Sequence, residues 1–312
     1  MIFGLRILLV AFGFFGVLYC LLSLLLAGVW RCVQILRPDR FSMSAGTLFT
    51  LRILPLAASV FITLTLAIPA FLQLESNAID EDLGTIMFCL VALMILAAGA
   101  SRAAKAHLNT GRMVAEWMEG AHALDMDAVT PALRVKSGAP PLLLVGISAP
   151  QVVVSETAVA LLSNDELQLA LRHEMVHSRS RDNLKKLLFH CVPFPGMTDL
   201  ESTWQEATEL AADRDAVSSR GEAIDLAAAL LKLAQSAPLQ SAPALATGLV
   251  SDTMLVKSRV EGLLKWEGRK RRGWHDEVCY LCAPALAVGI YVSLHYSEAL
   301  LLTHQVTEWF VH

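Results

Sequence analysis

The stretch LSNDELQLALRHEMVHSRSRDN, residues 162–183, places two histidines and a glutamate close together in an otherwise apolar chain. Ser163 followed by Glu166 is the pattern of a capping box, and the leucines that follow have helical spacing. The stretch therefore predicts a helix that begins near Ser163 and continues through the histidines. On such a helix His173 and His177 share one face, so that their ring nitrogens can hold one metal ion.

His173, Glu174 and His177 together form the H-E-x-x-H pattern of zinc peptidases. The glutamate, about 100° further round the helix, can reach a water molecule bound to the metal. Because zinc lowers the pKa of that water towards neutrality, the carboxylate can take its proton as the water attacks a peptide carbonyl. The alternative interpretation is a solvated helix face, since so short a pattern arises by chance in roughly one such chain in a hundred.

A third protein ligand is needed to complete the site, because catalytic zinc takes three protein ligands and a water. Glu209, in the stretch ELAAD, is the candidate, on a helix that can return antiparallel to the first. Asp213, one turn later, is placed to orient a ligating histidine. Spacing alone leaves Glu201 and Glu206 open as alternatives to Glu209.

The composition is that of a membrane protein, with 55% of the 312 residues hydrophobic and 17% charged. Three stretches without a charge are long enough to cross a hydrocarbon core: residues 7–30, 53–74 and 83–100. A fourth and weaker stretch begins at Val278. The first is too long for a secretion signal and is expected to remain as an anchor. Arg52, at the edge of the second, is expected to reach the lipid headgroups.

The loops between the spans predict the orientation, because Lys and Arg gather on the cytoplasmic side. Basic residues follow the first and third spans and precede the fourth, whereas the acidic stretch ESNAIDED, residues 75–82, separates the second from the third. The amino terminus is therefore predicted outside a bacterial inner membrane. The chain divides into a three-span region, 1–100, a cytoplasmic domain, 101–277, and a fourth span with a short tail, 278–312.

Charge and cysteine content exclude two other classes of protein. The formal net charge of −4 argues against direct nucleic-acid binding, since phosphate binding needs a large basic surface. The six cysteines lack the spacing of a secreted disulfide framework. The H-E-x-x-H pattern and the apolar stretches instead predict a protein substrate and the lipid bilayer as partners.

The cytoplasmic segment mixes strand and helix patterns. PLLLVGI and QVVVS, residues 141–147 and 151–155, predict a β-hairpin or two adjacent strands ahead of the H-E-x-x-H helix. Two further helices are predicted at residues 200–221, closed by Gly221, and at residues 222–236. The fold class is therefore an α-helical multi-pass membrane protein of about four spans with an inserted α+β domain.

The stretch quoted first, together with the later ELAAD, resembles the membrane-embedded zinc metallopeptidases of the BlaR/MecR type and the related HtpX type. In both groups a Leu-Ser-x-x-Glu-Leu element precedes H-E-x-x-H, and a Glu-x-x-x-Asp helix supplies the third ligand. The resemblance implies a gluzincin-like domain in which His173, His177 and Glu209 bind Zn2+. It also implies Glu174 as the general base and Asp213 as a support for a ligand.

Topology favours the BlaR/MecR type, because HtpX-like proteins have two spans before the motif rather than three. HtpX-like chains also carry a His-Pro pair shortly before an arginine, and that pair is missing ahead of Arg259. The resemblance therefore implies regulated signalling in which a cytoplasmic or membrane protein, such as a transcriptional repressor, is cleaved. Quality-control proteolysis and a non-catalytic signalling scaffold with a retained zinc site are the alternatives.

The antibiotic receptors of the BlaR/MecR type carry an extracellular penicillin-binding sensor after the last span. Only about ten residues follow the predicted fourth span here. The sensor is therefore expected to be missing, and a membrane partner is expected to supply the stimulus.

Overall fold

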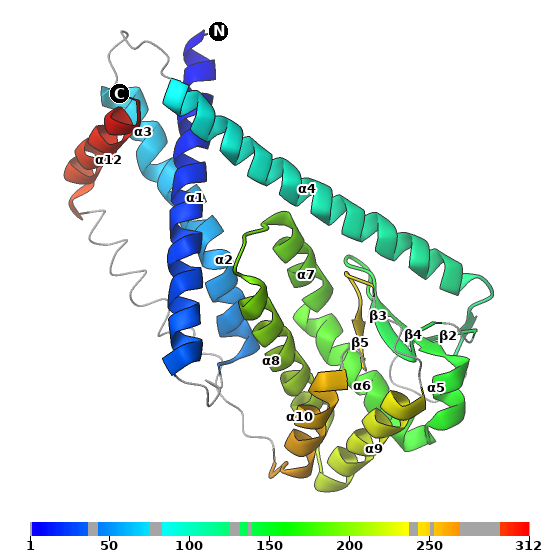
Figure 1. Cartoon of the computed structure of the whole chain (residues 1–312). Helices are drawn as coiled ribbons and strands as arrows, with labels where there is room; N and C mark the ends of the chain where they lie inside the picture. Colours follow the sequence, from blue (N-terminus) through cyan, green and yellow to red (C-terminus); the bar gives the residue numbers. More distant parts are fainter. Residues whose placement is uncertain are drawn as a thin grey trace. The chain divides into compact units, whose positions relative to one another are not determined.

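The computed structural model describes residues 2–36, 43–74, 83–124, 132–136, 139–236, 243–249, 253–268 and 294–311 (Figure 1). The chain forms two compact units. The first, called the helical unit, comprises Met1–Ala100, Cys191–Glu201 and Arg272–His312. The second, called the sheet unit, comprises Ser101–His190 and Ser202–Arg271.

The helical unit is built mainly from apolar helical segments, both long and short. They are α1 (Ile2–Leu36), α2 (Ala45–Ile62), a π-helical segment η1 (Thr63–Ala67), α3 (Ile68–Leu74), the first half of α4 (Leu83–Met118) and α12 (Tyr296–Val311). Three stretches are long and apolar enough to cross a membrane: Gly4–Leu36, Ala45–Gln73 and Ile86–Met118. They agree with the first three predicted spans. The predicted fourth span lies mostly outside the described residues.

Close backbone approaches hold these helices together. A Cβ added at Gly16 of α1 would lie 2.6 Å from the Ala92 Cβ of α4, which no side chain tolerates without a shift. Phe15, Tyr19 and Ala92 form a buried cluster with Val192, which lies 100 positions after Ala92 in the chain. Small residues therefore let α1 and α4 approach closely, as is common between helices in lipid.

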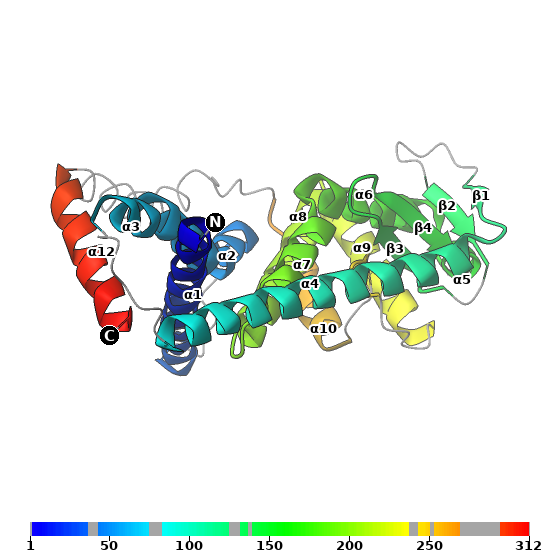
Figure 2. The ribbon, with the colours of Figure 1, turned by 90° about the horizontal axis from the view of Figure 1, so that it is seen from above.

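The sheet unit is built on a mixed five-stranded sheet of order β1-β2-β4-β3-β5, of which Figure 2 labels β1 to β4. The strands are β1 (His122–Ala123), β2 (Ala132–Val135), β3 (Leu142–Val145), β4 (Gln151–Ser155) and β5 (Thr247–Gly248). β3 and β4 pair antiparallel, which confirms the predicted hairpin, and β2 runs parallel to β4. All four residues of β3 are buried, because both faces of the sheet are covered.

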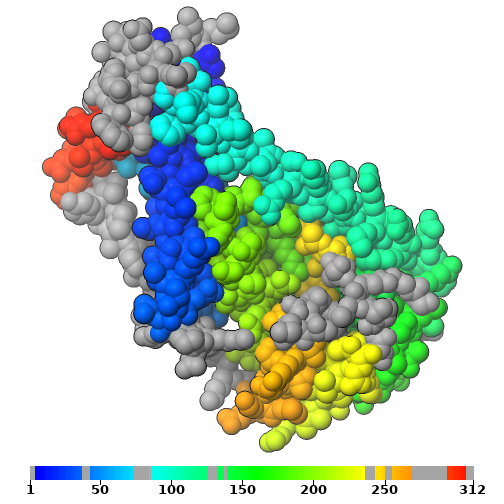
Figure 3. Space-filling model, in the orientation of Figure 1, coloured from blue at the N-terminus to red at the C-terminus, as the bar shows by residue number. Residues whose placement is uncertain are grey.

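Helices cover both faces of this sheet. On one face Val114, Trp117 and Met118, at the end of α4, pack against Leu143 and Val153. On the other face lie α5 (Glu156–Leu161), α6 (Asn164–Ser180), α9 (Arg220–Ser236) and α10 (Thr253–Leu264). α9 and α10 lie side by side (Figure 3). Most of α7 (Asp182–Cys191) and of α8 (Thr198–Ala216) belongs to this unit, whereas Cys191 and the first turn of α8 belong to the helical unit.

The helix boundaries confirm some predictions and correct others. Ser163 and Glu166 form the predicted capping box at the start of α6. Gly221 does not close a helix, because α8 ends at Ala216 and Gly221 lies in the first turn of α9. The sequence patterns also missed α7, which follows α6 after the single residue Arg181.

Candidate metal centre

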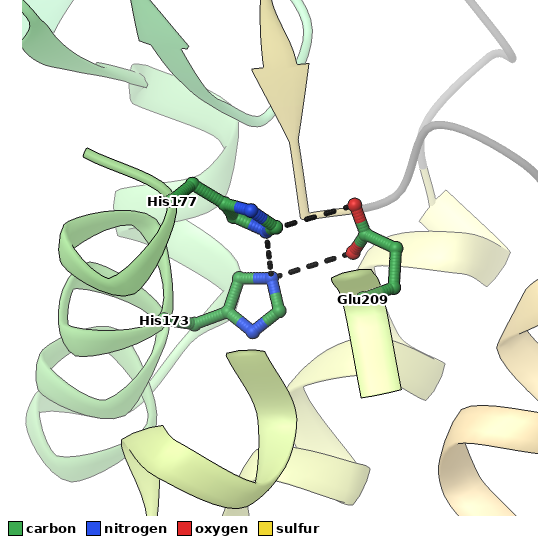
Figure 4. Close-up of side chains that lie close together, drawn as sticks. All are labelled: His173, His177 and Glu209. Carbon is green, nitrogen blue, oxygen red and sulfur yellow. Dashed lines mark hydrogen bonds and ion pairs between the residues drawn. The ribbon is translucent and has the colours of Figure 1, made fainter. Parts of the chain in front are cut away.

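Three side chains from two helices converge in the interior of the sheet unit (Figure 4). His173 and His177 project from the same face of α6, and Glu209 faces them from α8. The two Nε2 atoms lie 3.1 Å apart. Glu209 Oε2 lies 3.4 Å from His173 Nε2, and Oε1 lies 3.6 Å from His177 Nε2. All three side chains are buried.

These separations fit the requirements of a metal ion. Two atoms bonded to one tetrahedral ion at about 2.0–2.1 Å lie about 3.3 Å from each other. The two Nε2 atoms, at 3.1 Å, lie close to that value, and Glu209 offers a different oxygen to each ring, at 3.4 and 3.6 Å. One ligand atom from each of the three residues lies within 4.8 Å of the other two. Two imidazoles and one carboxylate are also a donor set that suits a divalent transition metal. The His-His-Glu group can therefore hold a metal ion.

A carboxylate lies beside the second nitrogen of each histidine. His177 Nδ1 lies 2.8 Å from Asp182 Oδ2, and His173 Nδ1 lies 3.0 Å from Asp213 Oδ1. When a carboxylate accepts the Nδ1 proton, the neutral imidazole carries its lone pair on Nε2. Asp182 thus holds the neutral His177 ring in the tautomer that binds a metal through Nε2, and Asp213 places a negative charge beside the His173 ring.

Arg259, from α10, joins the carboxylates of α8. Its guanidinium makes a two-pronged contact with Asp213, from Nε to Oδ2 at 2.7 Å and from Nη2 to Oδ1 at 2.6 Å. Nη1 lies 3.0 Å from Glu209 Oε2 and also donates to the backbone oxygen of Leu249. Nη2 approaches His173 Nε2 at 3.3 Å. The buried guanidinium therefore fixes the residues that α8 contributes to the site.

Glu174 lies beside the histidines on α6 and is fully buried. Neither of its carboxylate oxygens has a hydrogen-bonding partner in the described part of the chain. Burial raises its pKa to about 7, although the two histidines favour the ionised form. A carboxylate that titrates near neutrality is suited to both accept and release a proton.

The charges in the site keep the other carboxyl groups ionised. Burial alone raises the pKa of Glu209, but Arg259 and the histidines outweigh it and hold the pKa well below its usual range. Burial likewise opposes the charged form of His177, yet Glu209 and Asp182 raise its pKa to about 10. A proton therefore competes with a metal at His177, and metal affinity falls as the pH falls.

A polar clamp connects α7 with the edge of the sheet beside this site. Asn183 Nδ2 donates to the backbone oxygens of Leu144 and Gly146, at 3.1 and 3.0 Å, and its Oδ1 accepts from Thr247 Oγ1 at 2.8 Å. Lys186 Nζ donates to the backbone oxygen of Ala246 at 2.7 Å. The clamp fixes the helix that carries Asp182 against β3 and β5.

All five residues predicted for the site lie together: His173, Glu174, His177, Glu209 and Asp213. Of the three glutamates considered, Glu209 is the one in the group that could hold a metal, and Glu201 pairs with Arg52 instead. Sequence reasoning missed Asp182 and gave Arg259 no role. The periodicity of one continuous helix turns residue 182 away from His177, and no local pattern links Arg259 to α8.

The fold and the site together define a candidate membrane metallopeptidase, with three membrane-length helices and a buried His-His-Glu group beside a glutamate. The family model of the BlaR1 peptidase M56 matches residues 85–263, more than half of the chain, and the chain belongs to this family. The match confirms the resemblance to the BlaR/MecR type. No curated protein matches the chain.

Proposed function

We propose that the chain is a membrane-anchored zinc endopeptidase that hydrolyses peptide bonds of a cytoplasmic or membrane protein. The observation that carries this proposal is Glu174, a buried carboxylate without a hydrogen-bonding partner among the described residues, next to three converging donor atoms. A purely structural zinc site is closed by four ligands and needs no base beside it. An unpartnered buried carboxylate is costly, so its presence beside the three donor atoms favours a role in a reaction.

The residues divide the work of hydrolysis as follows. His173, His177 and Glu209 would hold the zinc ion, which when bound activates a water molecule and polarises the substrate carbonyl. Glu174 accepts the proton of the attacking water and then donates it to the leaving amine, as its pKa of about 7 permits. Asp182, Asp213 and Arg259 keep the ligands in position.

A test of the enzyme compares purified wild type with Glu174→Gln and Glu209→Ala in detergent, using a mixed library of quenched fluorescent peptides. Wild type should bind one zinc per chain and cleave, and Glu209→Ala should lose most of the zinc. Glu174→Gln should keep the zinc but cleave about 10²–10⁴-fold more slowly. Glu156→Gln, at an exposed position in α5, is the matched control. Zinc-bound wild type without activity would favour the non-catalytic scaffold.

The family membership and the basic loops support a regulated signalling role in a bacterial inner membrane. In this proposal the amino terminus lies outside, the metal centre is cytoplasmic, and a transcriptional repressor is the substrate. A separate membrane protein would supply the stimulus. Quality-control proteolysis is the second candidate. A signalling protease should cleave a purified repressor encoded by a neighbouring gene but not unfolded casein.

Cysteine labelling tests the proposed orientation. In a chain whose native cysteines are replaced, Asp80→Cys should react with an impermeant thiol reagent on intact cells. Gln235→Cys, near the end of α9, should react only after lysis. The reverse pattern would place the metal centre outside and exclude a cytoplasmic substrate.

A further inference from the structure

The segment between α7 and α8 packs directly on the membrane helices of the helical unit. A Cβ added at Gly99 of α4 would lie 2.0 Å from the backbone oxygen of Cys191, so the two backbones touch. The hydroxyl of Tyr19, in α1, donates to the backbone oxygen of Val192 at 3.3 Å. The Tyr19 ring also meets Phe194 edge to face, with centroids 5.8 Å apart. This segment is therefore anchored to two membrane-length helices.

A third membrane-length helix contributes a charge. Arg52, in α2, is only 2% exposed, which corrects the expectation that it reaches the lipid headgroups. Its Nε lies 2.7 Å from Glu201 Oε1, and its Nη2 donates to the backbone oxygen of Val192 at 2.6 Å. A buried arginine in an apolar span is costly, and such residues commonly mark a function together with their partner.

The partners of Arg52 lie at the ends of the two helices that flank the segment. Glu201 is in the first turn of α8, and Glu209 follows on the same helix about 12 Å further along its axis. Val192 follows directly after α7, which begins at Asp182, the carboxylate that holds His177. The Arg52 guanidinium thus contacts the first turn of α8, the helix that carries Glu209. It also contacts the residue directly after α7, the helix that carries Asp182.

We propose that Arg52 is a positioning residue for the metal centre, acting through Glu201 and Val192 on the placement of α8 and α7. The site needs its donors in place to within a fraction of an ångström, and α8 supplies Glu209 and Asp213 from one rigid element. Fixing the first turn of α8 fixes these side chains. A change in the position of α2 then reaches the metal ligands through the same contact. The proposal rests on the proposed metal site but not on its proteolytic activity.

Zinc affinity, measured by competition with a chelator, tests the proposal separately from proteolysis. Arg52→Gln and Glu201→Gln should each weaken zinc binding by about tenfold, as loss of outer support to a metal site commonly does. The double variant should bind no more weakly than Arg52→Gln alone, because Arg52→Gln already removes the contact with Glu201. Arg52→Lys should recover part of the affinity. The absorption bands of the cobalt-substituted protein should shift in the same variants, which reports a change in ligand geometry.

The control is Arg102→Gln, which removes an exposed charge from α4 and should leave zinc affinity and the cobalt bands unchanged. Unchanged zinc affinity in both single variants, or losses that add in the double variant, would overturn the proposal. If Arg52→Gln does not insert into the membrane, Glu201→Gln and Arg52→Lys provide the test. Glu201 tolerates substitution more readily because its side chain is 32% exposed. A wild-type protein that binds zinc but cleaves no substrate would contradict the proposed function. The zinc-affinity comparison would still test the role of Arg52.

Discussion

His177 Nδ1 lies 2.8 Å from Asp182 Oδ2, although the two residues are only five apart in the chain. On a continuous helix their side chains would point in directions about 140° apart. Arg181 makes the contact possible, because it adopts the left-handed conformation with φ 54° and ψ 42° and separates α6 from α7. The backbone break therefore supplies the histidine with its carboxylate.

Arg181 adopts a backbone conformation that favours glycine. Replacing it tests how much free energy of unfolding this conformation costs. Arg181→Gly should leave the free energy of unfolding unchanged or raise it by up to about 1 kcal/mol. Glycine adopts this conformation without strain, and the exposed arginine side chain contributes little stability. Arg181→Val should lower it by about 1–2 kcal/mol. Chemical denaturation in detergent measures both. A more stable valine variant would contradict the role assigned to this conformation.

Asp182 should matter for metal binding rather than for folding alone. Asp182→Asn keeps the shape of the side chain but removes the charge that holds His177 Nδ1, and zinc affinity should fall by about 10–100-fold. Lys185→Ala is the matched control, because it removes the ion pair at Asp182 Oδ1 and leaves the histidine contact in place. Equal losses of zinc affinity in the two variants would show that the contact between Asp182 and His177 does not determine the affinity. Chelator competition gives both affinities.

Arg259 should be required for stability of the sheet unit. Its removal leaves Glu209 and Asp213 buried without their cation, so Arg259→Gln should lower the free energy of unfolding by about 3–5 kcal/mol. Arg259→Lys should recover little, because an ammonium cannot make the two-pronged contact with Asp213. Denaturation of metal-free protein measures this effect apart from zinc binding. A lysine variant as stable as wild type would refute the geometric argument.

Glu166 should make the stability of the sheet unit depend on acidic pH. Burial raises its pKa, but Lys232 and the Ser163 N–H outweigh burial and lower the pKa below its ordinary value of 4.5. The stabilisation from the carboxylate is therefore complete above pH 4.5 and is lost as the pH falls through the lowered pKa. The stability difference between wild type and Glu166→Gln should shrink in that range. A constant difference down to low pH would contradict the pairing with Lys232.

Several elements could be predicted from local patterns. The capping box at Ser163, the hairpin of β3 and β4 and the first three apolar helices depend on residues close in sequence. The same holds for His173 and His177, since helical spacing alone brings them to one face. Glu209 needed the additional resemblance to a family, because spacing left three glutamates open.

Other features depend on contacts between distant segments. The boundary at Gly221 was predicted wrongly, because α8 ends at Ala216 and Gly221 lies in the first turn of α9. α7 was missed because the preceding break falls at an arginine, a residue that carries no signal for a left-handed backbone. No sequence pattern pairs Arg52 with Glu201 either, because the two residues are 149 positions apart in the chain.

Local composition and periodicity were sufficient to locate the apolar stretches that can cross a membrane and the helix face that carries two imidazoles and a carboxylate. The surroundings of those imidazoles could be found only in the folded chain. Asp182 reaches His177 across a backbone break, and Arg259 joins Asp213 from a different helix. The physical reason is that buried charges are stable only when partners surround them, and folding rather than sequence spacing brings those partners together.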